Sequence, residues 1–179
     1  MFTPNDYLVV LGWVCIMYGS RFGPVTRPEK FYEKNRVWLS PPGWVFGIAW
    51  TTLYAMVAVA GIMFYLTRPD TVWQYHVGSI VLIVNVLMQK VWLPLFFSLR
   101  WYLVALIDCA GALGTAVAFA IMAAWIAFEN EEPHAWVAFG MFVPYTLWLG
   151  FATFLSFEYV AGWYVPDDHE RRRHRHSKV

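Results

Sequence analysis

Charge is scarce in this sequence. Asp, Glu, Lys and Arg make up 14% of the 179 residues, against roughly 25% in ordinary soluble proteins. Hydrophobic residues reach 59% and aromatic residues 20%, with 11 tryptophans. A soluble domain of this length could not bury so much apolar surface, whereas a domain embedded in a bilayer has no need to bury it. The composition excludes an ordinary soluble domain and predicts one membrane-embedded domain over residues 1–179.

Residues for metal or covalent chemistry are also few. The two cysteines, Cys15 and Cys109, both fall inside apolar segments, and we interpret them as small core residues. No Cys/His cluster has zinc spacing, and the sequence has no phosphate-binding glycine loop or nucleophile elbow. The first apolar run begins at Tyr7 without a basic leader, so no signal peptide is predicted. We therefore expect no metal site, no required cofactor, no catalytic residue and no nucleic-acid partner.

Long hydrophobic runs are what the sequence has instead. Crossing the hydrocarbon of a bilayer takes about 20 helical residues, and lipid offers no partner to unpaired backbone groups, so spans are helical. The third run is long enough only if Asn85, Gln89 and Lys90 face protein rather than lipid. We predict an all-α membrane protein, a bundle of five transmembrane helices over about residues 6–22, 44–66, 77–99, 102–128 and 136–165.

The connections between the predicted spans differ in length. Three are short turns, which predict that the helices they join pack as antiparallel neighbours. The segment 19–42 is long, basic and proline-bearing, and we interpret it as a lid or binding loop. An amphipathic surface loop is the alternative.

Basic residues are distributed asymmetrically about the predicted membrane. With five spans, the first loop, the third loop and the tail 166–179 share one side, and of all Lys and Arg outside the spans only Arg68 lies opposite. Cytoplasmic loops carry the excess of Lys and Arg, so we expect a multi-pass protein with its C-terminus on the cytoplasmic or equivalent side. The sequence does not distinguish a mitochondrial from a bacterial membrane. The basic tail is suited to contact with anionic membrane lipids, with a solvated tail as the alternative.

Large rings recur inside the predicted spans. Trp50 and Tyr54 are four residues apart and share one face of the second span. Trp92 lies in the third span and Trp148 in the fifth. Any single ring is most simply a packing or lipid-facing residue. Several deep rings on different helices, with N–H and O–H groups to satisfy, instead predict an aromatic-lined cavity.

Three ionisable residues, Lys90, Asp108 and Glu158, fall inside predicted spans. Such residues are costly in lipid and usually face a cavity or one another. Counting from the loops places all three roughly 10–15 Å in from the basic side of the membrane. We expect Lys90 to approach Asp108 or Glu158, with separate snorkelling of Lys90 and Glu158 toward headgroups as the alternative.

The fourth span carries a row of small residues at a spacing of four, Ala112, Ala116, Ala120 and Ala124. Such a row lets helices approach closely. We interpret it as packing within the bundle, and a homodimer seam is the alternative.

Three motifs carry a family resemblance. PPGWVFGIAWTTLY opens the second span, WLPLFF followed by ALID joins the third to the fourth, and VPYTLWLGFATFLS lies in the fifth. In this order, with five spans, they resemble motifs of the TspO/MBR family, the tryptophan-rich sensory proteins and mitochondrial translocator proteins. The resemblance covers most of the chain from Trp38 onward. It implies a five-helix bundle holding a pocket for tetrapyrroles, sterols and synthetic aromatic ligands, capped by the first loop.

The resemblance also implies which residues bind the ligand. The rings would stack on it, while Asn85, Gln89 and Lys90 would orient its polar edge, and Lys90 could pair with a carboxylate. The predicted ligand-binding residues are Trp50, Tyr54, Asn85, Gln89, Lys90, Trp92, Asp108, Trp148 and Ala152.

This sequence departs from the family pattern at several positions. Gln89 and Lys90 stand where the family has an asparagine and an aromatic residue, and Glu158 stands where an aromatic is usual. After Tyr159 and Tyr164 no Lys or Arg follows within five residues, which disfavours a sterol-specific site. The polar replacements favour a ligand that carries carboxylates.

Three functions are compatible with these residues. The first is a receptor, carrier or sensor that binds a porphyrin, haem, lipid or other flat apolar molecule. The second is an accessory subunit of a larger membrane complex, with the pocket filled by a Lys90–Glu158 pair. The third is light- or oxygen-dependent tetrapyrrole breakdown resting on Trp50 and Trp148. We favour a protein that is not an enzyme, because the spans supply no general base or metal.

Overall fold

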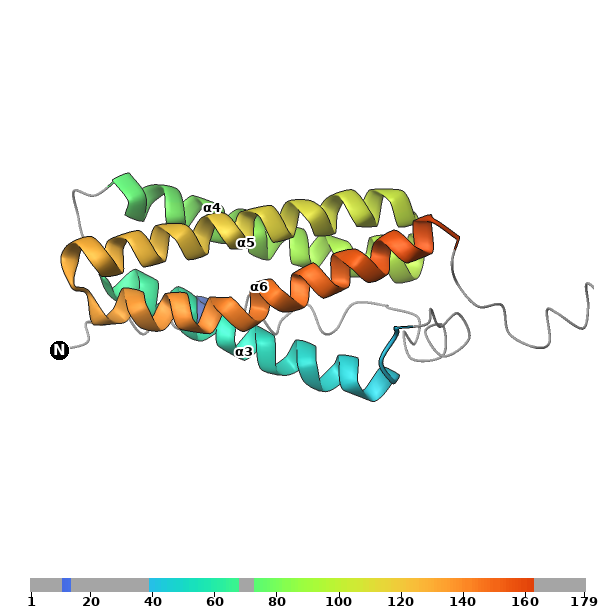
Figure 1. The fold of residues 1–179 in the computed structure, drawn as a ribbon, viewed down its shortest axis with the longest axis horizontal. Helices are drawn as coiled ribbons and strands as arrows, with labels where there is room; N and C mark the ends of the chain where they lie inside the picture. The colour runs from blue at the N-terminus through green and yellow to red at the C-terminus, as the bar shows by residue number, and fades with distance from the viewer. Residues whose placement is uncertain (1–10, 14–38, 68–72, 163–179) are drawn as a thin grey trace, which may run out of the picture.

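Four long helices make up most of the described structure. The computed structural model describes residues 11–13, 39–67 and 73–162, and Figure 1 shows the helices lying along one long axis. They are α3 (Gly43–Thr67), α4 (Trp73–Leu93), α5 (Tyr102–Asn130) and α6 (Pro133–Val160), and a short π-helix, η2 (Pro94–Leu99), continues α4. Four helical segments are long and apolar enough to cross a membrane. The expected all-α membrane bundle is therefore confirmed for four of its helices.

The structure describes only a short piece of the N-terminal part of the chain. Residues 11–13, inside the first predicted span, are helical. The Trp13 ring packs against Gly61 of α3, where an added Cβ would lie 2.9 Å from that ring. Most of the predicted lid, residues 19–38, lies outside the described residues, and so does the predicted basic tail 166–179.

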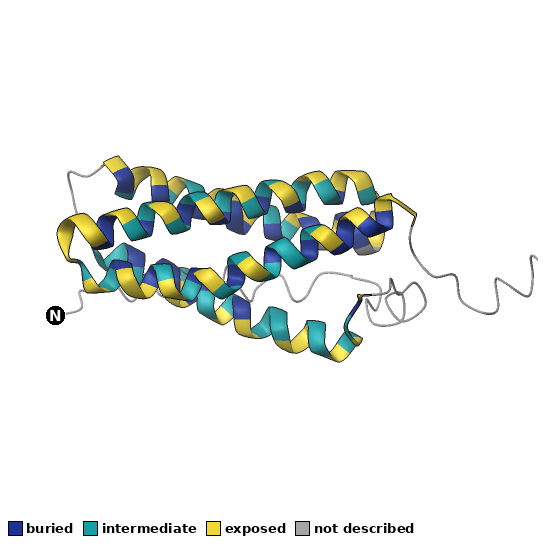
Figure 2. Ribbon diagram, in the orientation of Figure 1, coloured by how far each residue is buried: buried dark blue, intermediate teal, exposed yellow. Residues whose placement is uncertain are grey.

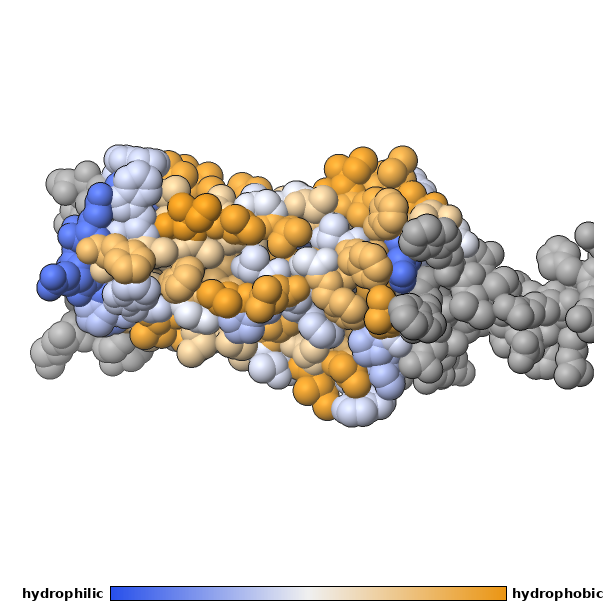
Figure 3. Space-filling model, viewed as in Figure 1, coloured by the Kyte–Doolittle hydropathy of each residue, from blue (hydrophilic) through white to orange (hydrophobic). Residues whose placement is uncertain are grey.

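The helices follow one another around the bundle in the order α3, α6, α5 and α4. Their buried residues face inward and their exposed residues face outward (Figure 2). Apolar side chains cover the middle of the face drawn in Figure 3, and hydrophilic ones gather at the end where α5 meets α6. Exposed tryptophans lie near helix starts at both ends of the bundle, where membrane proteins place interfacial rings: Trp44, Trp73, Trp101 and Trp136.

The helix boundaries follow from local sequence. Pro41 and Pro42 precede α3, and the Pro42 carbonyl accepts a hydrogen bond from the Val45 N–H at 2.9 Å. Arg100, with φ 56°, reverses the chain between η2 and α5. Between α5 and α6, Glu131 takes a left-handed conformation and Pro133 occupies the first turn of α6, where its missing N–H needs no partner.

The last helix ends earlier than the predicted limit of residue 165. It stops at Val160, with the Ala161 N–H donating to the Phe157 carbonyl at 2.8 Å. Gly162 follows with φ 73°, a conformation that commonly terminates helices. Glu158 therefore lies in the last turn of α6 rather than two turns inside it.

One half of the bundle, between its middle and the α5–α6 turn, is densely packed. Phe119 lies at the centre of this half, with its ring 4.9 Å from that of Phe64 and 4.3 Å from that of Phe142. Small residues of α5 and α6 fill the space between these rings. We call this region the sealed half, and its fully buried members are Phe64, Phe119, Ala123, Ile126, Ala127, Ala135, Ala138 and Phe142.

The row of alanines on α5 lies partly inside the bundle. Ala112 and Ala116 are buried, which supports the interpretation that they let α5 approach its neighbours closely. Ala120 and Ala124 are only partly buried.

Candidate ligand-binding site

Aromatic rings from four elements gather in the half of the bundle where α3 begins and α6 ends. Trp50 is central, because its ring centroid lies 5.4 Å from Tyr54, 5.8 Å from Trp92 and 6.3 Å from Trp148. These separations are typical of favourable aromatic pairs. Four residues predicted to bind the ligand are thus brought together. We call the whole group the ring cluster: Phe46, Trp50, Tyr54, Trp92, Phe96, Trp148 and Tyr159.

The sequence places these rings by helical spacing. Asn85, Gln89, Trp92 and Phe96 recur at intervals of three or four and are all buried, so they form one face of α4 and η2. On α6, Trp148 and Ala152 recur in the same way. Trp92 and Ala152 meet at a small cavity between the helices.

A hydrogen-bonded polar group lies beneath the ring cluster. Asn85 donates to the Ala112 carbonyl at 2.7 Å and to Thr115 Oγ1 at 2.9 Å. Its Oδ1 accepts from Gln89 Nε2 at 3.0 Å and from the Tyr145 hydroxyl at 2.9 Å, and Gln89 also donates to Tyr145. This polar layer joins α4, α5 and α6. The expectation that Asn85 and Gln89 face protein rather than lipid is confirmed.

Lys90 does not make the predicted ion pair. Its Nζ lies over the Tyr54 ring, 5.4 Å from the centroid, and in the described part of the chain no ion pair joins Lys90 to Asp108 or Glu158. The expectation was wrong because α4 turns Lys90 toward α3, whereas Asp108 lies on α5 and Glu158 at the end of α6. A cation over an aromatic face is an alternative way to stabilise the charge.

Among the described residues, the two carboxylates make no hydrogen bond or ion pair with the ring cluster. Asp108 is half-buried on α5, next to Cys109, whose sulfur accepts from the Thr153 hydroxyl at 3.3 Å. Glu158 is buried. One carboxylate oxygen of each is buried without a hydrogen-bond partner among the residues that the structure describes. No hydrogen bond or ion pair links Asp108 to the predicted site residues of α3, α4 or α6 within those same residues, so its membership of the site stays a prediction.

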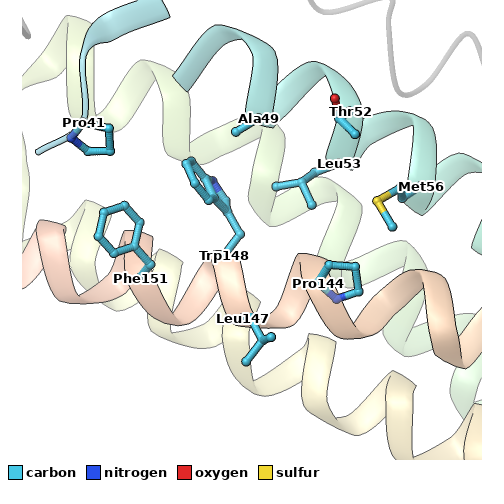
Figure 4. A pocket seen from close by; sticks show the side chains of 9 residues that line it. All are labelled: Pro41, Ala49, Thr52, Leu53, Met56, Pro144, Leu147, Trp148 and Phe151. Atoms are coloured by element: carbon cyan, nitrogen blue, oxygen red, sulfur yellow. The ribbon is translucent and has the colours of Figure 1, made fainter. Parts of the chain in front are cut away.

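Two cavities adjoin the ring cluster. The inner one, of about 20 Å³, lies between Trp92, Ala152 and neighbouring rings and is large enough for about one water molecule. The outer one is a groove between α3 and α6 of about 670 Å³ (Figure 4). Trp148 lines the groove and also belongs to the ring cluster. The groove is lined by Pro41, Ala49, Thr52, Leu53, Met56, Pro144, Leu147, Trp148 and Phe151.

Several members of this site are absent from the list of predicted ligand-binding residues. Tyr145 is fully buried and completes the polar layer, and its position three residues before Trp148 was the available signal. Phe46 lies four residues before Trp50, and its ring is 5.5 Å from Trp148. Thr115, the hydroxyl partner of Asn85, had no signal, because one threonine in an apolar span is ordinary.

Apolar membrane-length helices around an inner aromatic cluster define the class of this protein: a tryptophan-rich, multi-pass integral membrane protein. The sequence profile of the TspO/MBR family matches residues 8–161, and the chain belongs to that family. The chain is 31% identical over 148 residues to the translocator protein homolog of Schizosaccharomyces pombe, covering 82% of this chain and 85% of that one.

Two prokaryotic relatives are similarly close. The chain is 30% identical over 149 residues to the tryptophan-rich protein TspO of Archaeoglobus fulgidus, which covers 83% of this chain and 90% of that one. It is 27% identical over 138 residues to the tryptophan-rich sensory protein of Cereibacter sphaeroides, covering 76% of this chain and 78% of that one. The resemblance inferred from the three motifs is confirmed.

Proposed function

We propose that this membrane protein is a receptor or carrier that binds a flat apolar ligand among the rings of α3, α4 and α6. Protoporphyrin and haem are the first candidates. The observation that carries the proposal is the contact of Trp50 with Tyr54, Trp92 and Trp148, which brings large rings from three helices together. The names of two relatives, tryptophan-rich sensory protein and translocator protein homolog, suit such a role.

Polar atoms at the ring cluster would fix the orientation of the ligand. Gln89 Oε1 and Trp148 Nε1 are buried and lack a hydrogen-bond partner within the described residues. Burying such atoms without a partner costs about 1–3 kcal/mol each. A ligand that donates to Gln89 and accepts from Trp148 would offset this cost. Lys90, over the Tyr54 ring, is placed to pair with a ligand carboxylate.

The inner cavity is too small for such a ligand, so binding requires a ring to move. A cavity of about 20 Å³ cannot hold a tetrapyrrole. Trp148 is the ring with open space beside it, because it also lines the groove of about 670 Å³. We propose that Trp148 swings aside to admit the ligand and then packs against its face, so that the ligand lies between Trp50 and Trp148.

The filled interior also favours a second candidate function. A bundle whose rings already pack against one another can serve as an accessory subunit of a larger membrane complex without binding a ligand. That function predicts stable co-purification with a large assembly and no ligand-induced change in the rings.

A titration separates the two candidates. The protein in detergent micelles is titrated with protoporphyrin and with haem while tryptophan emission is followed, for the wild type and for Lys90→Trp, which restores the aromatic of the family motif. The receptor proposal predicts saturable quenching of the wild type at micromolar ligand. Binding by Lys90→Trp alone would mean that Lys90 closes the site in the natural protein, and the accessory-subunit function would then be preferred.

A further inference from the structure

The groove between α3 and α6 opens toward the bilayer. Its walls come from the membrane-crossing parts of both helices, and its residues are almost all apolar (Figure 4). Leu147 at its border is 71% exposed. Because hydrocarbon surrounds these helices in a membrane, an apolar molecule dissolved in the bilayer can reach the groove without crossing a polar surface.

The Trp148 side chain borders both this groove and the ring cluster. Trp148 forms part of the groove wall, and its ring also contacts Phe46 at 5.5 Å and Trp50 at 6.3 Å, edge to face in both cases. The Trp148 Nε1 atom is buried without a hydrogen-bond partner among the described residues. No hydrogen bond of the indole therefore opposes a rotation of this ring.

The helix that carries Trp148 lacks one backbone hydrogen bond close to this ring. Pro144, one turn before Trp148, lies inside α6 and lines the groove. Proline has no N–H to donate to the carbonyl four residues earlier, which loosens a helix and allows it to bend. Gly150 lies two residues after Trp148, and a Cβ there would meet nothing within 4 Å.

We propose that the α3–α6 groove is a lateral entrance through which a flat apolar ligand passes from the bilayer into the ring cluster, with Trp148 as its gate. The proposal rests on the ligand-binding function proposed above. It adds that the ligand arrives from the membrane and that the rate of binding is set at this groove. Residues that narrow the groove then slow entry and exit together, and they leave the bound state unchanged.

The test measures binding rates rather than affinity alone. The full-length protein is placed in lipid nanodiscs, and stopped-flow mixing with protoporphyrin is followed by quenching of tryptophan emission. Ala49→Phe places a ring in the groove opposite Trp148 (Figure 4). Ala55→Phe is the matched control, because Ala55 is exposed on the same helix and does not line the groove. Ala49→Leu is a milder variant to be used if the phenylalanine is not tolerated.

If the ligand enters through the groove, Ala49→Phe lowers both kon and koff about tenfold and leaves Kd within about twofold of the wild type. Ala55→Phe changes neither rate. Unchanged rates in Ala49→Phe, with normal binding by the wild type, would show that the groove is not the entrance. The proposed ligand-binding function would still stand. A higher Kd through faster dissociation would also overturn the entrance, because the groove would then be the binding site itself. Absence of saturable binding by the wild type would overturn the proposed function, and the entrance with it.

Discussion

The two halves of this bundle use the same helices and similar apolar residues, but they are packed differently. In the sealed half, Phe64, Phe119 and Phe142 are fully buried among alanines. In the other half, Trp50 and Trp148 are only partly buried, and both cavities described above border rings of that half. The polar layer of Asn85, Gln89 and Tyr145 lies between them.

This difference assigns the stability of the fold to the sealed half and ligand binding to the other half. Small residues allow close helix contact and hold the sealed half together, so that half can keep the bundle folded while the other half rearranges. Large rings pack less completely and leave space beside Trp148. The account therefore predicts that substitutions in the sealed half change the free energy of unfolding, and that substitutions in the ring cluster change ligand binding.

The largest expected effect is on the centre of the sealed half. Phe119→Ala removes a ring with no exposed surface, and such a truncation typically lowers the free energy of unfolding by about 3–5 kcal/mol. Phe46→Ala, in the partly buried ring cluster, should lower it by less than about 2 kcal/mol. Unfolding by SDS in mixed micelles measures both values. Equal losses would remove the distinction between the two halves.

The polar layer should show an intermediate effect. Tyr145→Phe removes the hydroxyl that bonds Asn85 and Gln89 and leaves those buried amides with fewer partners. The expected loss of unfolding free energy is about 1–3 kcal/mol. Ser79→Ala is the control, since its hydroxyl donates to the Tyr75 carbonyl within α4 at 2.8 Å, and we expect a change below about 0.5 kcal/mol. Similar values for the two variants would argue against a structural role for the layer.

A pair of glycine substitutions should give effects of opposite sign. A Cβ at Gly78 would lie 2.6 Å from Phe64 Cζ, and Phe64 cannot retreat because it is stacked on Tyr75 and packed against Phe119. Gly78→Ala should therefore destabilise the protein by about 1–3 kcal/mol. Gly150→Ala meets no neighbour and should stabilise it by about 0.5–1 kcal/mol. Thermal unfolding of the two variants in one detergent checks both signs, and destabilisation by Gly150→Ala would show that this segment is more tightly packed than described.

Local patterns were sufficient to predict much of this structure. Helix α3 follows from two prolines before a long uncharged run, and the burial of Asn85 and Gln89 follows from the cost of exposing amides to lipid. The grouping of Trp50, Tyr54, Trp92 and Trp148 was predicted from spacing and resemblance.

The features that could not be predicted depend on packing between residues that are far apart in the sequence. The direction of Lys90 depends on the order of helices around the bundle, which places Tyr54 rather than Asp108 or Glu158 beneath its ammonium group. The size of the inner cavity depends on how the rings of Trp92, Phe96 and Phe46 pack, and spacing does not determine that. The end of α6 depends on a left-handed residue at Gly162.

The central claim is that the ring cluster, and not tryptophan content in general, binds the ligand. The most direct measurement is the protoporphyrin Kd, followed by the absorbance of the ligand, for the wild type, Trp50→Ala and Trp73→Ala. Trp73 is an exposed tryptophan at the opposite end of the bundle. The account predicts that Trp50→Ala raises Kd at least about tenfold, the equivalent of about 1.4 kcal/mol, and that Trp73→Ala leaves it unchanged. Equal Kd values for both variants, or no saturable binding by the wild type, would contradict it.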